Sequence, residues 1–398
     1  MHRKRWTMVF LCLVCFIMTG CAEGQELKYV SFISSTGVDK IGPRHFRLWL
    51  VPLSIGETGQ QENNAAKNRL NSLIIRDGET AFDIERNMIR ETKHRVVFTH
   101  ARAVVVSERM AKEDLGWFVD TWFRDQQPHS RAYLFVTPSS VKDVLIYATW
   151  LEPEVSFPLS FGMENIRFVS NYATLDLIDC LKHLHEPPYN AILPMIQTNM
   201  SKSPPTVEYR GTAVIRHGKM VGSLNTPETQ GLVWLLGLEK GGSLQFQANG
   251  KNTAPSVLEL NAEHKRLQVH WVGQHLQVQY FLHLQGTIAQ DGTSDDSWST
   301  AHRSSLERKA EDAVQRICQQ TITALQKTDS CDALRVGLYV YRHDPSQWHQ
   351  HASLWDSVFS NAEIRVHVQV TIQHPGLVRR NLAPPSLKGG SHGHSSPL

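Results

Sequence analysis

The chain has 398 residues, enough for about two or three domains, and its 41% hydrophobic content is typical of packed cores rather than disorder. Its 41 Lys and Arg residues exceed its 38 Asp and Glu residues by a formal net charge of +3, and Arg3, Lys4 and Arg5 account for the excess. A chain cleaved soon after these residues is neutral overall, which argues against a nucleic-acid partner. No interior apolar run approaches the ~20 residues that span a bilayer, which excludes polytopic membrane proteins.

The first residues have the pattern of an export signal. A basic stretch at residues 2–5 is followed by an apolar stretch at residues 6–18 and then by small residues. Met18-Thr19-Gly20-Cys21 resembles the lipobox of bacterial lipoproteins, in which the cysteine thiol receives diacylglycerol. We therefore expect residues 1–20 to be a lipoprotein signal peptide and Cys21 to anchor the protein to the outer face of the cytoplasmic membrane. The alternative is an ordinary signal peptide that contains a cysteine.

The other cysteines predict no catalytic chemistry. Cys12 and Cys15 form a Cys-x-x-Cys pair, but both lie in the segment expected to be removed. Cys180, Cys318 and Cys331 are an odd set that cannot pair completely within the chain. They are interpreted as small buried hydrophobic residues, and a bridge between Cys318 and Cys331 stays open as the alternative.

Strands and helices alternate in the first half of the chain. Extended segments are expected at residues 29–34, 46–53, 95–108 and 131–136. Helices are expected at residues 79–92, 110–124, 138–151 and 171–185. We divide this half into an N-terminal α/β domain I, residues 21–130, and a smaller domain II, residues 131–200.

A change of pattern follows the Ser- and Pro-rich residues 201–206, which we interpret as a linker. Domain III, residues 207–380, is expected to be α+β, and residues 381–398 a disordered tail. Domain III is expected to begin with a hairpin around His217-Gly218. Alternating strands are expected at residues 267–271, 276–284, 334–340 and 364–372. A long helix is expected to begin with a Ser304/Glu307 capping box.

No motif for nucleophilic, phosphate-binding or zinc chemistry occurs after the signal segment. Three histidine pairs have the spacing of metal fragments but not of a defined site, and we interpret them as solvated or packing residues: His183 and His185, His349 and His351, and His392 and His394. Arg124-Asp125 is interpreted as a local ion pair, and Trp348 and Trp355 as core or interface aromatics on one helical face. The sequence therefore assigns no catalytic, cofactor-binding or metal-binding residue.

Several local patterns together resemble the Ger(x)C lipoproteins, the C subunits of spore germinant receptors. The resemblance covers roughly residues 17–378. In the first half it rests on Glu26-Leu27, Thr36-Gly37-Val38-Asp39-Lys40, Glu79-Thr80-Ala81-Phe82, Phe98-Thr99-His100-Ala101 and Arg124-Asp125. In the second half it rests on Gly211-Thr212-Ala213-Val214, Met220-Val221-Gly222-Ser223-Leu224, residues 332–337, Tyr341-Arg342-His343-Asp344-Pro345, Trp348 and Trp355. The chain departs from the family at Ala22-Glu23, where Trp-Asp is usual, and in its His/Gly/Ser tail.

The resemblance implies an elongated, three-domain α+β protein with mixed sheets flanked by helices. It implies a non-enzymatic subunit, anchored in the inner spore membrane beside a transporter-like B subunit and a multi-span A subunit. The family has no assigned catalytic residue, so none is transferred to this chain. The alternative function is a solute-binding lipoprotein of a membrane transporter, although a hairpin and long alternating strands favour antiparallel pairing over repeated βαβ lobes. A third candidate function, a cell-surface hydrolase, is supported by no motif in the sequence.

Overall fold

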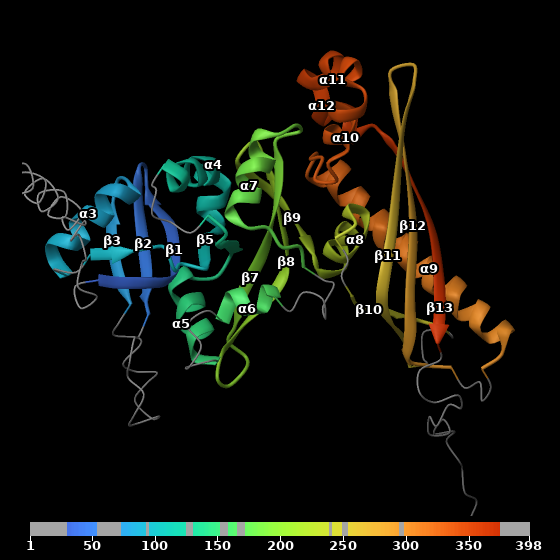
Figure 1. The fold of residues 1–398 in the computed structure, drawn as a ribbon, viewed down its shortest axis with the longest axis horizontal. Coiled ribbons are helices and arrows are strands. Elements are labelled where there is room, and N and C mark those ends of the chain that lie inside the picture. The colour runs from blue at the N-terminus through green and yellow to red at the C-terminus, as the bar shows by residue number, and fades with distance from the viewer. Residues whose placement is uncertain are drawn as a thin grey trace, which may run out of the picture.

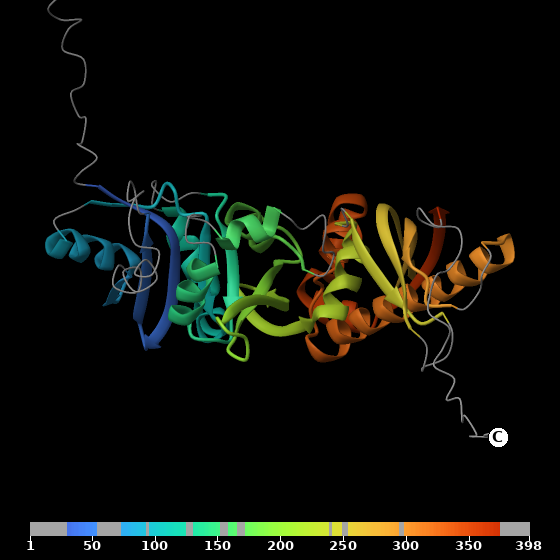
Figure 2. The same cartoon turned by 90° about the horizontal axis from the view of Figure 1, so that it is seen from below.

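The fold is an elongated body in which two sheets lie one after the other along the long axis (Figures 1 and 2). This computed structural model describes residues 30–53, 73–92, 95–124, 130–151, 158–164, 172–238, 241–248, 254–293 and 298–374. Both sheets mix parallel and antiparallel strands and are flanked by helices, which confirms the predicted α+β class. None of the described helices combines the length and apolar composition needed to cross a bilayer.

The first sheet has the strand order β3-β2-β1-β5-β6-β7-β8-β9, with β4 paired to β1. Its strands are β1 (Val30–Gly42), β2 (His45–Pro52), β3 (Ile74–Gly78), β4 (Arg95–Val97), β5 (Ala103–Ser107), β6 (Tyr133–Thr137), β7 (Asn190–Asn199), β8 (Thr206–Arg216) and β9 (Lys219–Asn225). The parallel strands β1, β5 and β6 lie at its centre. All five residues of β5 are buried, because helices cover both faces of the sheet there.

Five helices cover the first sheet: α3 (Ala81–Thr92), α4 (Glu108–Arg124), α5 (Val141–Leu151), α6 (Pro158–Glu164) and α7 (Leu177–His185). One core lies under α4 and α7 and includes Leu115, Val119 and Cys180. The other lies under α5 and α6 and includes Val144 and Leu159. The predicted amphipathic stripe of residues 110–124 is therefore confirmed, since Leu115, Phe118, Val119 and Trp122 are all buried.

The second sheet has the order β10-β11-β12-β13, with strands β10 (Gly242–Phe246), β11 (Ser256–Val272), β12 (His275–Gln290) and β13 (Glu363–His374). β11 and β12 form a long antiparallel hairpin, and β13 pairs with β12 in parallel. Alternate residues of β12 are buried, as its sequence pattern predicts. These buried residues pack with Leu306, Ala310 and Val314 of α9 (Thr300–Thr323), which crosses one face of the sheet (Figure 1).

The remaining helices lie around the second sheet. They are α8 (Thr226–Leu236), a π-helical turn η3 (Ala324–Thr328), α10 (Val336–His343), α11 (Pro345–His351), a 3-10 turn η4 (Ala352–Leu354) and α12 (Trp355–Ser360). Trp348 of α11 and Trp355 of α12 are buried with ring centroids 5.1 Å apart. They are core aromatics as expected, but they belong to two short helices rather than to one helical face.

Strands β7 and β8 connect the two halves of the molecule. Ala191 and Ala213 face the core under α4 and α7, whereas Ile192 and Val214 face the core that contains α8 and the second sheet. The two sides of one strand pair therefore contribute to two cores. The solute-binding alternative requires two lobes with a ligand site between them, whereas this junction is filled by packed side chains.

Residues 201–206, expected as a linker, have a different role in the structure. Residues 200–205 form the turn of the antiparallel β7–β8 hairpin, and Thr206 begins β8 opposite Asn199. The Ser- and Pro-rich composition therefore marks a turn between paired strands, because such residues are also typical of turns. The first sheet continues through this turn, and the division into domains I, II and III stays a prediction.

Three further expectations need correction. Residues 334–340 form no strand, because α10 begins at Val336. The long helix begins at Thr300 with Ser299 as its N-cap, one turn before the predicted Ser304/Glu307 capping box. The strand expected over residues 95–108, with a bulge near His100, is instead divided at that position into β4 and β5 by a turn at residues 99–100. Local hydrogen bonds decide the first two cases, because Asp332 caps the first N–H groups of α10 and Ser299 caps the start of the long helix.

Candidate coupling site between the two sheets

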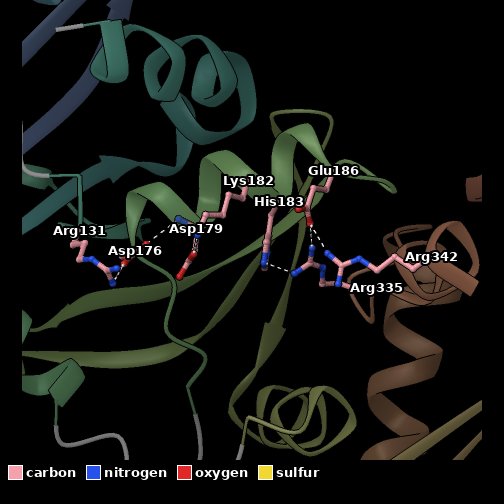
Figure 3. A network of polar contacts seen from close by, with 8 residues as sticks. All are labelled: Arg131, Asp176, Asp179, Lys182, His183, Glu186, Arg335 and Arg342. Atoms are coloured by element: carbon pink, nitrogen blue, oxygen red, sulfur yellow. Dashed lines mark hydrogen bonds and ion pairs between the residues drawn. The ribbon is translucent and has the colours of Figure 1, made fainter. Parts of the chain in front are cut away.

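Arg335 connects the two halves of the molecule through a forked contact with α7 (Figure 3). Its Nη1 donates to Nε2 of His183 at 2.5 Å, and its Nη2 donates to Oε2 of Glu186 at 2.9 Å. Arg342 of α10 reaches the same carboxylate oxygen at 3.5 Å. The two cations also lie at the C-terminal end of α7, where the helix dipole favours positive charge. We call these four residues the coupling site.

His183 accepts the hydrogen bond from Arg335, because a guanidinium has no acceptor. The imidazole is therefore neutral, with its proton on Nδ1. Burial lowers the pKa of His183 from 6.5 to about 4, and the positive charge of Arg335 lowers it further in the same direction. Burial also lowers the pKa of Arg335, although Glu186 opposes this shift.

Asp332 fixes the backbone from which Arg335 extends. Its buried carboxylate accepts hydrogen bonds from the backbone N–H of Val336 at 3.0 Å and of Gly337 at 2.6 Å, and from Nε1 of Trp355 at 3.0 Å. Arg335 has a left-handed φ of 59°, which turns the chain just before α10. Burial raises the pKa of Asp332 to about 6 even though three donors favour its charged form.

A second set of contacts joins the β8–β9 hairpin to the segment before α10. Nη1 of Arg216 donates to the carbonyl of Ser330 at 3.0 Å and lies 3.8 Å from the carboxylate of Asp356. Asp329 is 4% exposed, and its Oδ2 has no hydrogen-bond partner in the described structure. Burial raises the pKa of Asp329 to about 6, and nearby Glu228 raises it further. The coupling site is thus supported by contacts from both halves.

The geometry of this site suits mechanical connection rather than catalysis. Each charged group of the coupling site is engaged by another group of the same site. Within the described residues, no group of three or more His, Cys, Asp or Glu side chains is arranged to hold a metal ion. The Arg335–Glu186 pair is only partly buried, and it favours one relative orientation of the two halves because its two partners come from different halves.

The predicted histidine pairs do not act together. His183 contacts Arg335, whereas Nδ1 of His185 contacts the carbonyl of Leu181 at 2.9 Å. His349 and His351 each contact the carbonyl four residues before them, at 2.6 and 2.9 Å. His392 and His394 lie outside the described residues.

Cys180, Cys318 and Cys331 are buried free thiols in the structure, in line with the interpretation as small hydrophobic residues. Burial raises the pKa of Cys180 to about 12 and raises the pKa of the other two thiols as well. Cys21, the predicted lipidation residue, lies outside the described residues. Arg124 pairs with Asp120 at 2.7 Å, while Asp125 is outside the described part.

No sequence pattern predicted the coupling site as a unit. Arg335 lies in the family pattern at residues 332–337, but Glu186 is 149 residues away and belongs to no quoted pattern. Asp332 is part of the family pattern noted above, but its role in capping α10 depends on Trp355 of a later helix. Only the three-dimensional arrangement brings these residues together.

Two family models together match most of the chain. The model for the spore germination protein N-terminal domain matches residues 23–198. The model described as spore germination B3/GerAC like, C-terminal, matches residues 210–376. The chain belongs to this family of spore germination proteins. The two matches meet near the β7–β8 hairpin, where the two cores share their strands.

Relatives of the spore germination family support this assignment along the whole chain. Spore germination protein YndF of Bacillus subtilis (strain 168) is 22% identical over 95% of this chain and 98% of its own length. Spore germination protein B3 of the same organism is 19% identical over 94% of this chain and 98% of its own length. The crystal structure of the GerBC protein matches with a TM-score of 0.57 and 17% identity, covering 86% of this chain and 98% of that one, and shows the same fold.

Proposed function

We propose that this chain is the non-enzymatic C subunit of a spore nutrient germinant receptor, needed for receptor assembly and germination signalling. The match of both family models, in order and over most of the chain, carries the proposal. The paired polar groups of the coupling site support a role in binding and transmission rather than in turnover of a substrate. The proposed partners are the A and B membrane subunits.

Diacylglycerol on Cys21 is the proposed membrane anchor, with the protein on the outer face of the inner spore membrane. Eight residues, 22–29, separate Cys21 from the first described strand. A chain of this length spans at most about 30 Å when fully extended, so an anchor at Cys21 keeps the start of β1 near the bilayer. β1 lies at one end of the elongated body, and the second sheet lies at the other (Figure 2).

The anchor is tested with Cys21→Ala and with the matched variant Cys15→Ala, whose cysteine lies in the predicted signal segment. Labelled palmitate should enter the parent chain and Cys15→Ala but not Cys21→Ala, and only Cys21→Ala should leave the membrane fraction. The proposal of a lipid anchor fails if Cys21→Ala is still processed and stays fully membrane-bound in cells that lack the partner subunits.

Receptor membership is tested separately by co-purification. The tagged chain should bring the A and B subunits with it from spore membranes, and deletion of its gene should abolish germination by nutrients while germination by dodecylamine persists. Purification of the chain free of both subunits, or normal nutrient germination without it, would contradict the proposed function.

A further inference from the structure

The face of the second sheet that points away from α9 carries two histidines side by side. Alternate residues of β12 are buried on the α9 side, so the residues between them, including His283, lie on the opposite face. His264 of β11 lies directly opposite His283 in the antiparallel pairing. His283 is half-buried, and His264 is exposed. The side chains of such a cross-strand pair share one face, with Cβ atoms about 4.5–5.5 Å apart.

The separation of the two imidazole rings suits a ligand shared between them. The ring centroids of His264 and His283 are 6.3 Å apart, and the ring planes are inclined by 41°. Zinc binds imidazole nitrogen at about 2.0–2.1 Å in tetrahedral geometry, which places two imidazoles on one ion with centroids about 5–6 Å apart. A small rotation of the exposed His264 side chain closes this difference, and the backbone need not move.

Thr371 of β13 orients the ring of His283. Nε2 of His283 lies 2.9 Å from Oγ1 of Thr371. A neutral imidazole has one donor nitrogen and one acceptor nitrogen. In the tautomer that carries its proton on Nε2, the ring donates to Thr371 and keeps the lone pair of Nδ1 for a metal ion. Histidines that bind metals are usually oriented by such a hydrogen bond from the other ring nitrogen.

The ring of His264 has no competing polar contact. Within the part of the chain that the structure describes, its side chain forms no hydrogen bond and no ion pair, and its ring contact is with His283. Arg266 lies two residues further along the same face, with its guanidinium 4.4 Å from the centroid of the Phe281 ring. The positive charge of Arg266 opposes a second cation nearby. The imidazole of His264 is nevertheless available to a ligand.

We infer that His264 and His283 together bind a divalent transition-metal ion, Zn²⁺ or Cu²⁺, across β11 and β12. Imidazole nitrogen suits both ions, and Cu²⁺ is expected to bind more tightly than Zn²⁺. Within the described residues, no third His, Cys, Asp or Glu joins the pair, so water molecules complete the coordination. The ion links the two strands and stabilises the hairpin, because the pair is assembled only in the folded chain.

The test is a calorimetric titration of Zn²⁺ into the purified chain at pH 7.5. Every protein in it carries His392→Ala and His394→Ala, so that the histidine pair near the C-terminus does not contribute. His264→Ala and His283→Ala should each weaken Zn²⁺ binding by about tenfold or more. The double variant should bind no more weakly than either single variant, because each substitution alone already removes the shared site. Mg²⁺ should not compete, because it prefers oxygen ligands.

His270 provides the matched control. It lies on the same face of the same hairpin, but the residue opposite it is Gln277. His270→Ala should therefore leave Zn²⁺ binding unchanged. Arg266→Gln, which removes the nearby positive charge, should strengthen binding. Thr371→Val should weaken it several-fold, whereas Thr371→Ser, which keeps the hydroxyl group, should bind like the parent chain. Equal affinities of the two Thr371 variants would overturn the orienting role of this residue.

A spectroscopic measurement identifies the ligands directly. Electron spin-echo spectra of the chain with one equivalent of Cu²⁺ should show two coordinated imidazoles, and only one in either single variant. The inference is overturned if His264→Ala and His283→Ala leave the affinity unchanged, if their effects add as those of two independent sites do, or if neither changes the Cu²⁺ spectrum. Absence of binding at about 1 mM Zn²⁺ would overturn it as well.

Discussion

Gly116 and Gly218 meet main chain to main chain, where the N–H of Gly116 donates to the carbonyl of Gly218 at 2.8 Å. α4 is kinked at Asp114, whose φ of −141° is not helical. The kink frees the N–H of Gly116 from the helix, and the β8–β9 turn accepts it. This contact fixes α4 against the β8–β9 hairpin, whose strands contribute buried residues to the cores of both halves.

Gly218→Ala should therefore be strongly destabilising. A Cβ at this position would lie 3.0 Å from Cα of Gly116, and the residue has a φ of +77°. Gly273→Ala is the matched control, because its φ is +64° but nothing lies within 4 Å of the added Cβ. We expect losses of about 2–4 kcal/mol for Gly218→Ala and about 1–2 kcal/mol for Gly273→Ala, measured by urea unfolding. Equal losses would show that the close approach has no energetic role.

His183 should make the stability of the protein depend on pH. Its folded pKa of about 4 lies below the unfolded value of 6.5, so the unfolded chain binds more protons between these values. Stability is then lost as the pH falls from 6.5 towards 4, by about 3 kcal/mol at most. The groups that face the imidazole are Arg335, Asp179, Glu186 and Lys182.

The substitution His183→Gln keeps a hydrogen-bond acceptor for Arg335 but removes the titratable imidazole. The variant should lose less stability than the parent chain between pH 6.5 and 4.5, in urea unfolding at several pH values. His185→Gln, on the same helix but exposed, should follow the parent chain. A parallel pH profile for His183→Gln and the parent would contradict a neutral, partly buried His183.

Asp329→Asn should stabilise the protein at neutral pH. The folded pKa of Asp329, about 6, lies above its unfolded value of 3.8, so the charge destabilises the fold above pH 6. The amide has the same shape and removes this penalty, which gives an expected gain of about 1–3 kcal/mol at pH 7.5. The gain should shrink as the pH falls towards 4. Asp356→Asn, which removes the partner of Arg216, should bring no gain.

Arg335→Ala should loosen the angle between the two sheets. The substitution leaves Glu186 without its 2.9 Å partner and removes the donor to His183. Pairs of spin labels on β2 and β12 should give a broader distance distribution by double electron–electron resonance. Arg342→Ala removes only the more exposed contact at 3.5 Å and should broaden it less. Identical distributions for all three proteins would show that the shared core alone sets the angle.

Removal of the two α9 carboxylates that accept hydrogen bonds from the edge of β13 should cause self-association. Glu307→Ala together with Glu311→Ala exposes the N–H groups of Ile372 and Val370 to pairing with another chain. The control replaces both residues by glutamine, which still accepts the hydrogen bonds but has no charge. Sedimentation velocity should show oligomers for the alanine pair only. Oligomers of both variants would point to charge rather than to the exposed edge.

The sequence predicted those elements whose own residues determine their structure. The alternation of β12 and the apolar stripe of α9 were both recognised, because a long regular pattern leaves few alternatives. The alternation at residues 334–340 predicted a strand, but α10 forms there because buried Asp332 caps its first N–H groups. The coupling site was not predictable, since its partners are 149 residues apart in the sequence.

The position of α9 has a thermodynamic consequence. The carboxylates of Glu307 and Glu311 bond β13, while Lys309 and Arg316 of the same rigid helix border β10. The N–H groups of Val370 and Ile372 can therefore exchange only when their bonds to α9 break, so anything that stabilises the docked position of α9 also slows hydrogen exchange at this edge.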